Sequence, residues 1–231
     1  MPTTKLTFPG SRGTQLAARL DTPDKKPLAY TIFAHCFTCS KDILAASRIA
    51  EALARQGIAV LRFDFTGLGA SGGEFASTDF SSNVEDLKMA ADYLRTHHGA
   101  PQILVGHSLG GAAALAAASD IPEVRAVATI NAPADAAHVI GSFGVHLDEI
   151  EKSGEAEVIL AGRSFCIRKD FLDDVRGQKL PERIAAMKRA LLVLHAPLDT
   201  IVGIENATAI FTAARHGIPR ASSHLMAPTT C

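Results

Sequence analysis

The chain has no excess of charge of either sign, and this limits the partners that it can bind. Its 231 residues include 23 lysines and arginines against 24 aspartates and glutamates, which gives a formal net charge of −1. Proteins that bind nucleic acids or anionic membranes usually carry a surplus of basic side chains. We therefore expect neither a nucleic acid nor a membrane among its partners.

Long apolar runs are also missing. No stretch approaches the roughly 18 consecutive apolar residues of a membrane span. The first ten residues, MPTTKLTFPG, lack the basic region, the apolar stretch and the small-residue cleavage site of a signal peptide. These absences predict a cytoplasmic protein.

Cysteine is scarce and mostly dispersed, at Cys36, Cys39, Cys166 and Cys231. This spacing implies no disulfide framework. Cys36 and Cys39 could form a redox or zinc C-x-x-C motif, but the chain is not thioredoxin-like and offers no second ligand pair at a suitable spacing. We expect these two side chains to pack beneath a turn, with no metal and no cofactor.

What the chain does contain is a regular alternation of apolar segments. A hydrophobic content of 47% is enough for one domain with a sizeable core. Continuous apolar runs predict buried strands at 28–35, 58–65, 102–106, 124–133 and 189–197. Apolar residues at helical spacing predict helices at 45–57, 81–99, 110–119 and 205–217. The fold class is therefore α/β, with a mostly parallel, doubly wound sheet behind an N-terminal hairpin.

Two parts of this single domain, residues 1–231, break the alternation. Residues 134–188 include EVILAGRSFCIRK, which resembles a small hairpin, and we interpret the segment as a lid over the strand ends. The tail, 218–231, reads as neither an apolar strand nor a helix. The core then comprises 1–133 and 189–217.

The stretch Gly106-His107-Ser108-Leu109-Gly110 matches the G-x-S-x-G pattern between a predicted strand and a predicted helix. In such a turn the serine backbone is strained, so residues two positions away must have almost no side chain. The turn lifts the serine Oγ above the sheet edge at a helix N-terminus. We predict Ser108 as a nucleophile and the amide of Leu109 as an oxyanion donor. The alternative is a glycine-rich turn with no chemical role.

Two neighbouring turns would border this site. In FAHCFTCSKD, residues 33–42, Phe37 occupies the third position of an H-G-F-like turn, with Cys36 in place of glycine. That turn supplies the second oxyanion amide in serine hydrolases, so Phe37 is the predicted donor. The glycine-rich stretch 62–74 does not open a helix directly, as a dinucleotide-binding loop would, and we interpret it as a scaffold loop.

An acid is expected just beyond a late strand. Asp199 follows the strand predicted at 189–197, where a carboxylate can orient a histidine and stabilise its charged form. The order of serine before acid also fits. Asp135, after the preceding strand, is the second candidate, and a role for Asp199 in capping the next helix is the non-catalytic alternative.

These motifs together resemble the α/β-hydrolase superfamily. FAHCFTCSKD, GIAVLRFDFTGLGASGGEFAST, GHSLGGAA, VRAVATINAPAD and LDTIVGIENA are most similar to the hydrolase half of bacterial proteins that fuse an α/β-hydrolase to an OsmC-like domain. The resemblance covers residue 5 to about residue 216. It implies Ser108 as nucleophile, Asp199 as acid, Phe37 and Leu109 as oxyanion donors, and a small-molecule acyl substrate.

The resemblance also implies a histidine after one more strand, in a pattern like D-G-A-D-H-L. His224 follows Asp199 too closely for this pattern, so we expect that it is not the general base. Displacing the reading frame by one base forces glycine at the junction of Met226 and Ala227 and permits D-G-A-D-H-L there. We therefore interpret the tail as truncated or frame-shifted, with the last strand and helix missing.

The leading hypothesis is a serine hydrolase that acts on an ester or related acyl substrate, with turnover impaired if the triad histidine is lost. The alternative is a catalytically inert, hydrolase-like binding or scaffold protein. A peroxide or redox protein that uses Cys36 and Cys39 ranks last. With the last strand missing, residues 190–196 would form an unpaired sheet edge, which predicts aggregation or a homodimer through that edge.

Overall fold

An eight-stranded, mostly parallel sheet forms the centre of the molecule. The structure is a computed structural model and describes residues 1–214 and 220–224. The strands lie in the order β1-β2-β4-β3-β5-β6-β9-β10. Only β1 and β2 are antiparallel to their neighbours; from β4 onward every neighbouring pair is parallel, which confirms the predicted fold class. The strands are β1 (Thr3–Pro9), β2 (Gln15–Asp21), β3 (Ala29–Ala34), β4 (Ile58–Phe63), β5 (Pro101–His107), β6 (Ala126–Ile130), β9 (Ala190–His195) and β10 (Arg220–His224).

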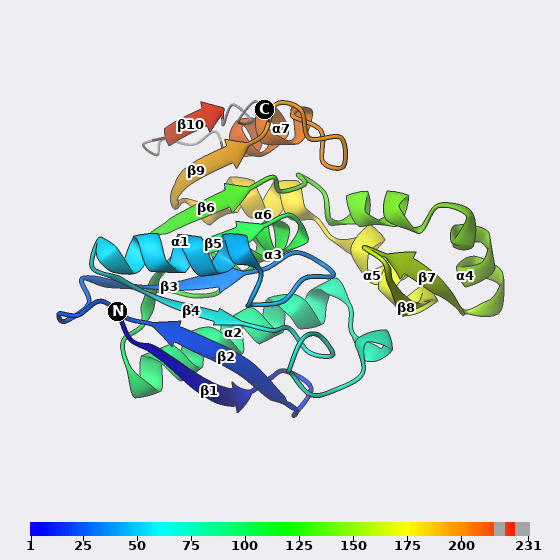
Figure 1. Cartoon of the computed structure of the whole chain (residues 1–231). Helices are drawn as coiled ribbons and strands as arrows, with labels where there is room; N and C mark the ends of the chain where they lie inside the picture. Colours follow the sequence, from blue (N-terminus) through cyan, green and yellow to red (C-terminus); the bar gives the residue numbers. More distant parts are fainter. Residues whose placement is uncertain (215–219, 225–231) are drawn as a thin grey trace, which may run out of the picture.

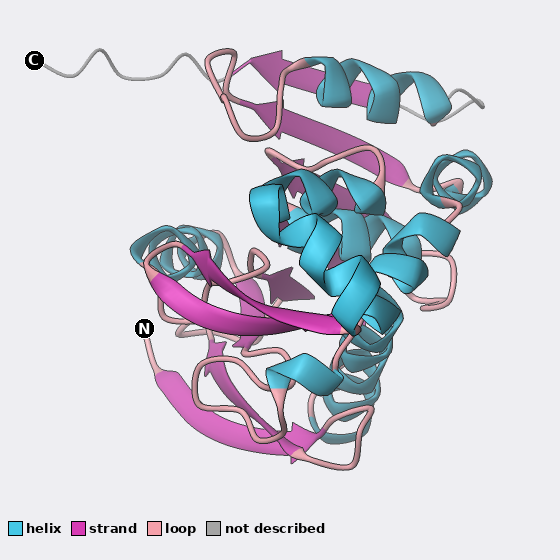
Figure 2. Cartoon of the chain, turned by 90° about the vertical axis from the view of Figure 1, so that its right-hand side faces the viewer, coloured by secondary structure: helices cyan, strands magenta, loops and turns pink. Residues whose placement is uncertain are grey.

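Helices cover the sheet on two faces, as Figures 1 and 2 show. Helix α1 (Leu44–Arg55) lies on one face, and α2 (Phe80–His97) and α3 (Leu109–Ala117) lie on the other. All nine residues of α3 are buried, and seven of them are alanine or glycine; the other two are leucines. Small side chains let this helix approach the sheet closely, so its N-terminus is held firmly against the end of β5.

Helix α2 begins at a capping box. The Asp79 side chain accepts a hydrogen bond from the Ser82 amide at 2.6 Å, and the Ser82 hydroxyl accepts one from the Asp79 amide at 2.9 Å. These bonds satisfy two backbone groups that the helix itself cannot pair. A short helical turn, η1 (Phe75–Ser77), precedes it.

The chain between β6 and β9 forms a small subdomain beside the strand ends (Figure 1). It contains the predicted hairpin, β7 (Glu155–Leu160) and β8 (Arg163–Arg168), paired antiparallel. The helical segments η2 (Ala136–His146), α4 (Leu147–Ser153) and α5 (Lys169–Gly177) surround it. The last helix of the segment, α6 (Leu180–Met187), packs against α3 and α7 (Glu205–Ala213) and so belongs to the layer that covers the sheet. The function of the remainder as a lid stays a prediction.

One sequence expectation is wrong at the end of the sheet. The tail was expected to contain no strand, but Arg220–His224 forms β10, parallel to β9. Strand formation here depends on backbone pairing with β9, which a search for apolar side chains does not detect. Strand β9 is therefore flanked by β6 and β10, and the edge lies at β10. A homodimer through the edge stays a prediction, and residues 225–231, with the proposed frame-shifted histidine, lie outside the described residues.

Candidate active site

Ser108 stands at a strained turn between β5 and α3. Its φ of 53° and ψ of −128° are values that a residue with a side chain rarely adopts. The Ser108 amide donates a hydrogen bond to the carbonyl of Ile130 at 2.9 Å, which anchors the turn to the end of β6. The strain is thus maintained by the surrounding sheet, as the sequence pattern predicts.

The two flanking glycines are required by close backbone approach. A Cβ atom on Gly110 would lie 2.6 Å from the carbonyl oxygen of Ala34, at the end of β3. A Cβ atom on Gly106 would lie 2.6 Å from the amide nitrogen of Gly111. Neither backbone group can move without distorting the sheet, so both positions exclude any larger residue.

The turn after β3 brings Phe37 to the same region. The Phe37 ring packs against Phe75 and Phe171, with centroids 5.3 and 5.1 Å apart. Phe171 lies on α5 of the subdomain, so the aromatic contact joins the turn to that subdomain. A disulfide between Cys36 and Cys39 closes the turn, in place of the two free thiols that we expected to pack beneath it.

A buried carboxylate, which the sequence reasoning did not identify, holds this turn from below. Asp64 is fully buried and accepts hydrogen bonds at 2.6 Å from both the amide and the Nζ of Lys41. It also accepts one from the amide of Ala70 at 2.8 Å. Asp64 therefore ties the turn after β3 to the glycine-rich loop 62–74, which agrees with a scaffold role for that loop.

Asp199 lies beyond β9, with its carboxylate fully engaged. The amides of Ile201 and Val202 donate to Oδ1 at 2.8 and 2.9 Å, and the Asn131 side chain donates to Oδ2. Burial acts to raise the pKa of Asp199, but the hydrogen bonds from Val202, Ile201 and Asn131 outweigh it and lower the pKa below its usual value. Asp199 is therefore ionised throughout the neutral range.

The second candidate acid has a different environment. The Asp135 side chain accepts a hydrogen bond from the amide of Ala137 at 3.0 Å and caps η2. It is not among the residues that line the cavity around Ser108. Asn131 was not singled out from the sequence; its φ of 48°, in the region that asparagine tolerates best among residues with side chains, is the signal in hindsight.

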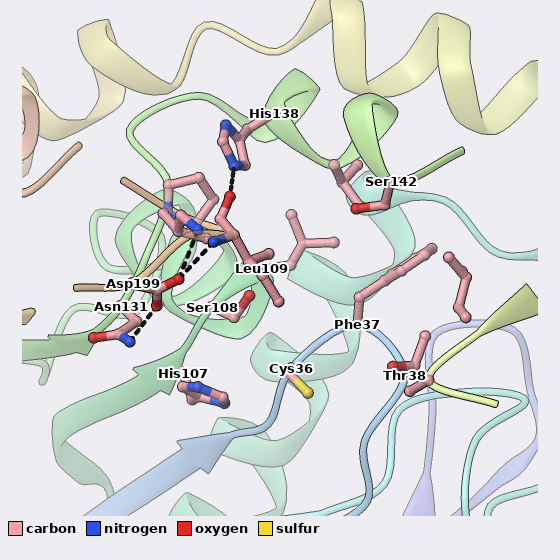
Figure 3. Close-up of a pocket in the computed structure, with 16 residues that line it drawn as sticks. Cys36, Phe37, Thr38, His107, Ser108, Leu109, Asn131, His138, Ser142 and Asp199 are labelled. Carbon is pink, nitrogen blue, oxygen red and sulfur yellow. Dashed lines mark hydrogen bonds between the residues drawn. The ribbon is translucent and has the colours of Figure 1, made fainter. Parts of the chain in front are cut away.

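A cavity of about 360 Å³ opens in front of Ser108, and Figure 3 shows its lining. Ser108, Leu109, Phe37 and Asp199 all border it, so the structure brings the four predicted site residues to one place. The other lining residues come from the turn after β3, the ends of β5 and β6, the subdomain and the loop after β9: Cys36, Thr38, His107, Asn131, Pro133, His138, Val139, Ser142, Leu160, Ala161, Ile201 and Val202.

Within the described part of the chain, no histidine side chain has a hydrogen bond to Ser108 or Asp199. His138 bonds to the carbonyl of Ile201 at 2.8 Å, and His195 bonds to the carbonyl of Val202 at 2.7 Å. Burial lowers the pKa of His107, although the charge of Asp199 acts in the opposite direction. The side chain of His224 lies outside the described structure; the backbone places this residue opposite His195 at the end of β10.

A membrane-crossing helix is not found in the described residues, since none of their helices is both long and apolar enough.

Comparison with known proteins agrees with this geometry. The chain is 50% identical to the esterase domain of a Rhodothermus marinus protein, with a TM-score of 0.78 over 97% of this chain and 88% of that one. It is 25% identical to a monoacylglycerol lipase of Mycolicibacterium smegmatis, over 85% of this chain and 79% of the lipase. The structure of Est1E from Butyrivibrio proteoclasticus, 18% identical, has the same fold, with a TM-score of 0.77 over 95% of this chain and 88% of that one. The family model described as serine aminopeptidase, S33, matches residues 25–147. The chain is therefore an α/β-hydrolase of the serine aminopeptidase S33 family.

Proposed function

We propose that this chain is an ester hydrolase with Ser108 as its nucleophile. The observation that carries the proposal is the strained Ser108 turn, which opens into a cavity that Asp199 also borders. The amides of Leu109 and Phe37 would stabilise the oxyanion that forms when the serine oxygen attacks the acyl carbonyl. Asp199 would orient the general base, and water would release the acyl group.

The cavity favours an ester with an apolar acyl group over a peptide N-terminus. Most of the larger lining side chains are apolar, with Phe37, Leu109 and Val139 among them. A peptide's ammonium group requires a free carboxylate. Among the described residues that line the cavity Asp199 is the one acid, and three hydrogen bonds occupy its carboxylate. The esterase and lipase relatives support this choice of substrate class.

The proposal includes slow turnover. His138 and His195 bond to backbone carbonyls, and no described histidine, His107 included, has a hydrogen bond to Ser108 or Asp199. A serine without a positioned base keeps an unactivated hydroxyl, and loss of a triad member costs several orders of magnitude in rate. This same observation favours a second candidate function, in which the domain binds an acyl compound without turning it over. The motifs that resemble the hydrolase half of OsmC-fused proteins support the proposal that this chain belongs to that branch of the α/β-hydrolases.

Labelling with a fluorophosphonate, combined with hydrolysis of p-nitrophenyl butyrate, tests the proposal. We expect the wild-type chain to be labelled at Ser108, at a low rate that matches its slow turnover, and the Ser108→Ala variant to remain unlabelled. The wild-type chain should hydrolyse the ester slowly, but faster than the Ser108→Ala variant does. Folded wild-type protein that is neither labelled nor active would reject the nucleophile, and labelling without turnover would favour the binding protein.

A matched control is available in the same cavity. Ser142 also lines the cavity but lies in η2, away from the strained turn. Ser142→Ala should therefore be labelled to the same extent as the wild type. If Ser142→Ala removes the label while Ser108→Ala retains it, the assignment of the nucleophile is wrong.

A further inference from the structure

Three potential metal ligands meet beside Ser108. One ligand atom from each of Cys36, Cys39 and His107 lies within 4.8 Å of the other two. No carboxylate belongs to the cluster. The sequence offered only the two cysteines, because nothing in their spacing points to a histidine so much later in the chain.

The sheet explains why these residues meet. Strands β3 and β5 are parallel neighbours, and Ala34 pairs with Gly106. Cys36 lies two positions beyond Ala34, and His107 directly follows Gly106. Both residues therefore lie at the carboxyl ends of neighbouring strands, next to each other. The turn then folds back, with the amide of Cys39 donating to the carbonyl of Cys36 at 3.2 Å, which returns the second sulfur to the same place.

His107 has an unused ring nitrogen. Its Nδ1 is buried and has no hydrogen-bond partner among the described residues. A buried polar atom without a partner is costly, and native structures rarely leave one without a reason. Cys36 and His107 also line the cavity in front of Ser108, as Figure 3 shows, so the cluster faces the proposed site.

Two thiolates and an imidazole select a particular class of cation. Sulfur and imidazole ligands suit Zn²⁺ and similar thiophilic ions, whereas Mg²⁺ and Ca²⁺ prefer oxygen ligands. Three protein ligands leave one tetrahedral position for water or another molecule. We propose that Cys36, Cys39 and His107, with the two cysteines reduced, form a binding site for a zinc-class cation, and that the bound cation inhibits hydrolysis at Ser108.

The cation can bind only after the disulfide between Cys36 and Cys39 has been reduced. A dithiol or phosphine reductant supplies two electrons, and two protons are taken up, so that the sulfur–sulfur bond becomes two thiols while the reductant is oxidised. Zinc binding then releases both thiol protons to solvent and forms two zinc–sulfur bonds and one zinc–nitrogen bond. With zinc–sulfur bonds of about 2.3 Å, the sulfurs must separate to about 3.8 Å, which the disulfide prevents.

Inhibition follows from position and rests on the proposed function. Phe37, whose amide is the proposed oxyanion donor, lies directly between residues of the cluster in sequence. A cation bound to Cys36 would fix this turn and occupy the cavity wall beside Ser108. Both effects oppose the entry of an acyl group.

Cobalt binding tests the site without any measurement of activity. The protein carrying Cys166→Ser and Cys231→Ser, reduced with tris(2-carboxyethyl)phosphine and freed of excess reductant without air, is titrated with Co²⁺. We expect one equivalent to bind with thiolate-to-cobalt charge-transfer absorption and the visible bands of a tetrahedral ion, and Zn²⁺ should displace it. The same protein with its disulfide intact should give no such spectrum, and this comparison requires no further substitution.

Variants then assign the ligands. Adding Cys36→Ser or Cys39→Ser should remove the charge-transfer band or weaken it strongly, and His107→Gln should lower the apparent affinity by more than about tenfold. Circular dichroism checks that each variant is folded. Folded, reduced protein that binds no Co²⁺, or that binds it equally with the disulfide intact, overturns the inference.

The activity arm separates the inference from the proposed function. One equivalent of Zn²⁺ should suppress Ser108-dependent hydrolysis by the reduced protein, and a chelator should restore it. Cobalt binding by a chain that never hydrolyses an ester would leave the metal site standing and reject the proposed function. Hydrolysis that Zn²⁺ does not reduce, in protein shown to bind it, would reject the inhibition.

Discussion

The side chain of Asn131 donates a hydrogen bond to the carboxylate of Asp199 and accepts one from the amide of Ala196 at 3.0 Å. A residue at the end of one strand thereby fixes both the acid and the start of the loop that carries it. The left-handed backbone of Asn131 limits which substitutions are informative. Glycine and aspartate can adopt this conformation at modest cost, so they change the side chain with little backbone strain.

Replacing Asn131 should move the pH dependence of the site. The donated bond stabilises the charged form of Asp199, so its loss should raise the pKa of that carboxyl. Asn131→Asp should raise it further than Asn131→Gly, because a second carboxylate adds repulsion while the acceptor for Ala196 is retained. Stability and activity that depend on ionised Asp199 are present above its pKa and are lost as pH falls through it, so the acidic limb should shift to higher pH.

Carboxyl NMR titration of Asp199 measures this shift directly, and the pH profile of kcat/KM measures it wherever turnover is sufficient. The effect should be absent in Asp135→Asn, which changes the acid that caps η2. An unchanged titration of Asp199 in Asn131→Asp would show that the contact has no electrostatic effect on the acid.

Adding a side chain to Gly110 should disrupt the fold. In Gly110→Ala the new Cβ atom would press against the backbone of Ala34 and His35, and overpacking of this kind costs about 1–3 kcal/mol, with more for Gly110→Val. Gly177→Ala is the matched control, because a Cβ atom there meets nothing within 4 Å. Urea unfolding should separate the two alanine variants, and equal midpoints would contradict the close approach described at the turn.

Breaking the buried pair of Lys41 and Asp64 should be costly. Lys41→Met leaves the Asp64 carboxylate buried without its cation, and removal of one partner from a buried pair costs about 3–5 kcal/mol. Lys169→Met removes a lysine from the solvent-exposed pair with Asp173 and should change stability little. Denaturant unfolding of both variants tests the contrast, and a small effect at Lys41 would mean that water reaches Asp64.

His224→Ala should leave any Ser108-dependent activity unchanged. The backbone places His224 within strand β10 and opposite His195, whereas the histidine implied by the resemblance follows a strand. The variant His138→Ala, which removes a histidine from the cavity lining, is assayed beside His224→Ala. Ester hydrolysis is measured against the Ser108→Ala background, and loss of that activity in His224→Ala alone would identify His224 as the base.

The sequence predicted the parts of the molecule that local pattern determines. The strand before Ser108, its two glycines and the small-residue helix after it are contiguous, so their geometry follows from neighbouring residues. The paired hairpin in the segment 134–188 was detectable for the same reason. These elements were sufficient for the fold class and for bringing Ser108 and Asp199 to one cavity.

The parts that escaped prediction depend on contacts between distant segments. Asp64 is an ordinary aspartate in sequence, and only the approach of Lys41 shows what it does. Asn131 and His107 gain their significance from Asp199 and Cys36, which lie on other strands. Strand β10 escaped because backbone pairing, and not apolar side chains, forms it.

The pairing of β3 with β5 also has a consequence in time. At about 5–20 residues per second, a ribosome takes several seconds to add the roughly seventy residues that separate Cys36 from His107. During that interval the two thiols are already synthesised, while the strand that will bring the imidazole to them does not yet exist. The nascent chain therefore contains both cysteines before the cavity in front of Ser108 can form, so the two sulfurs can be oxidised or reduced before the domain is complete.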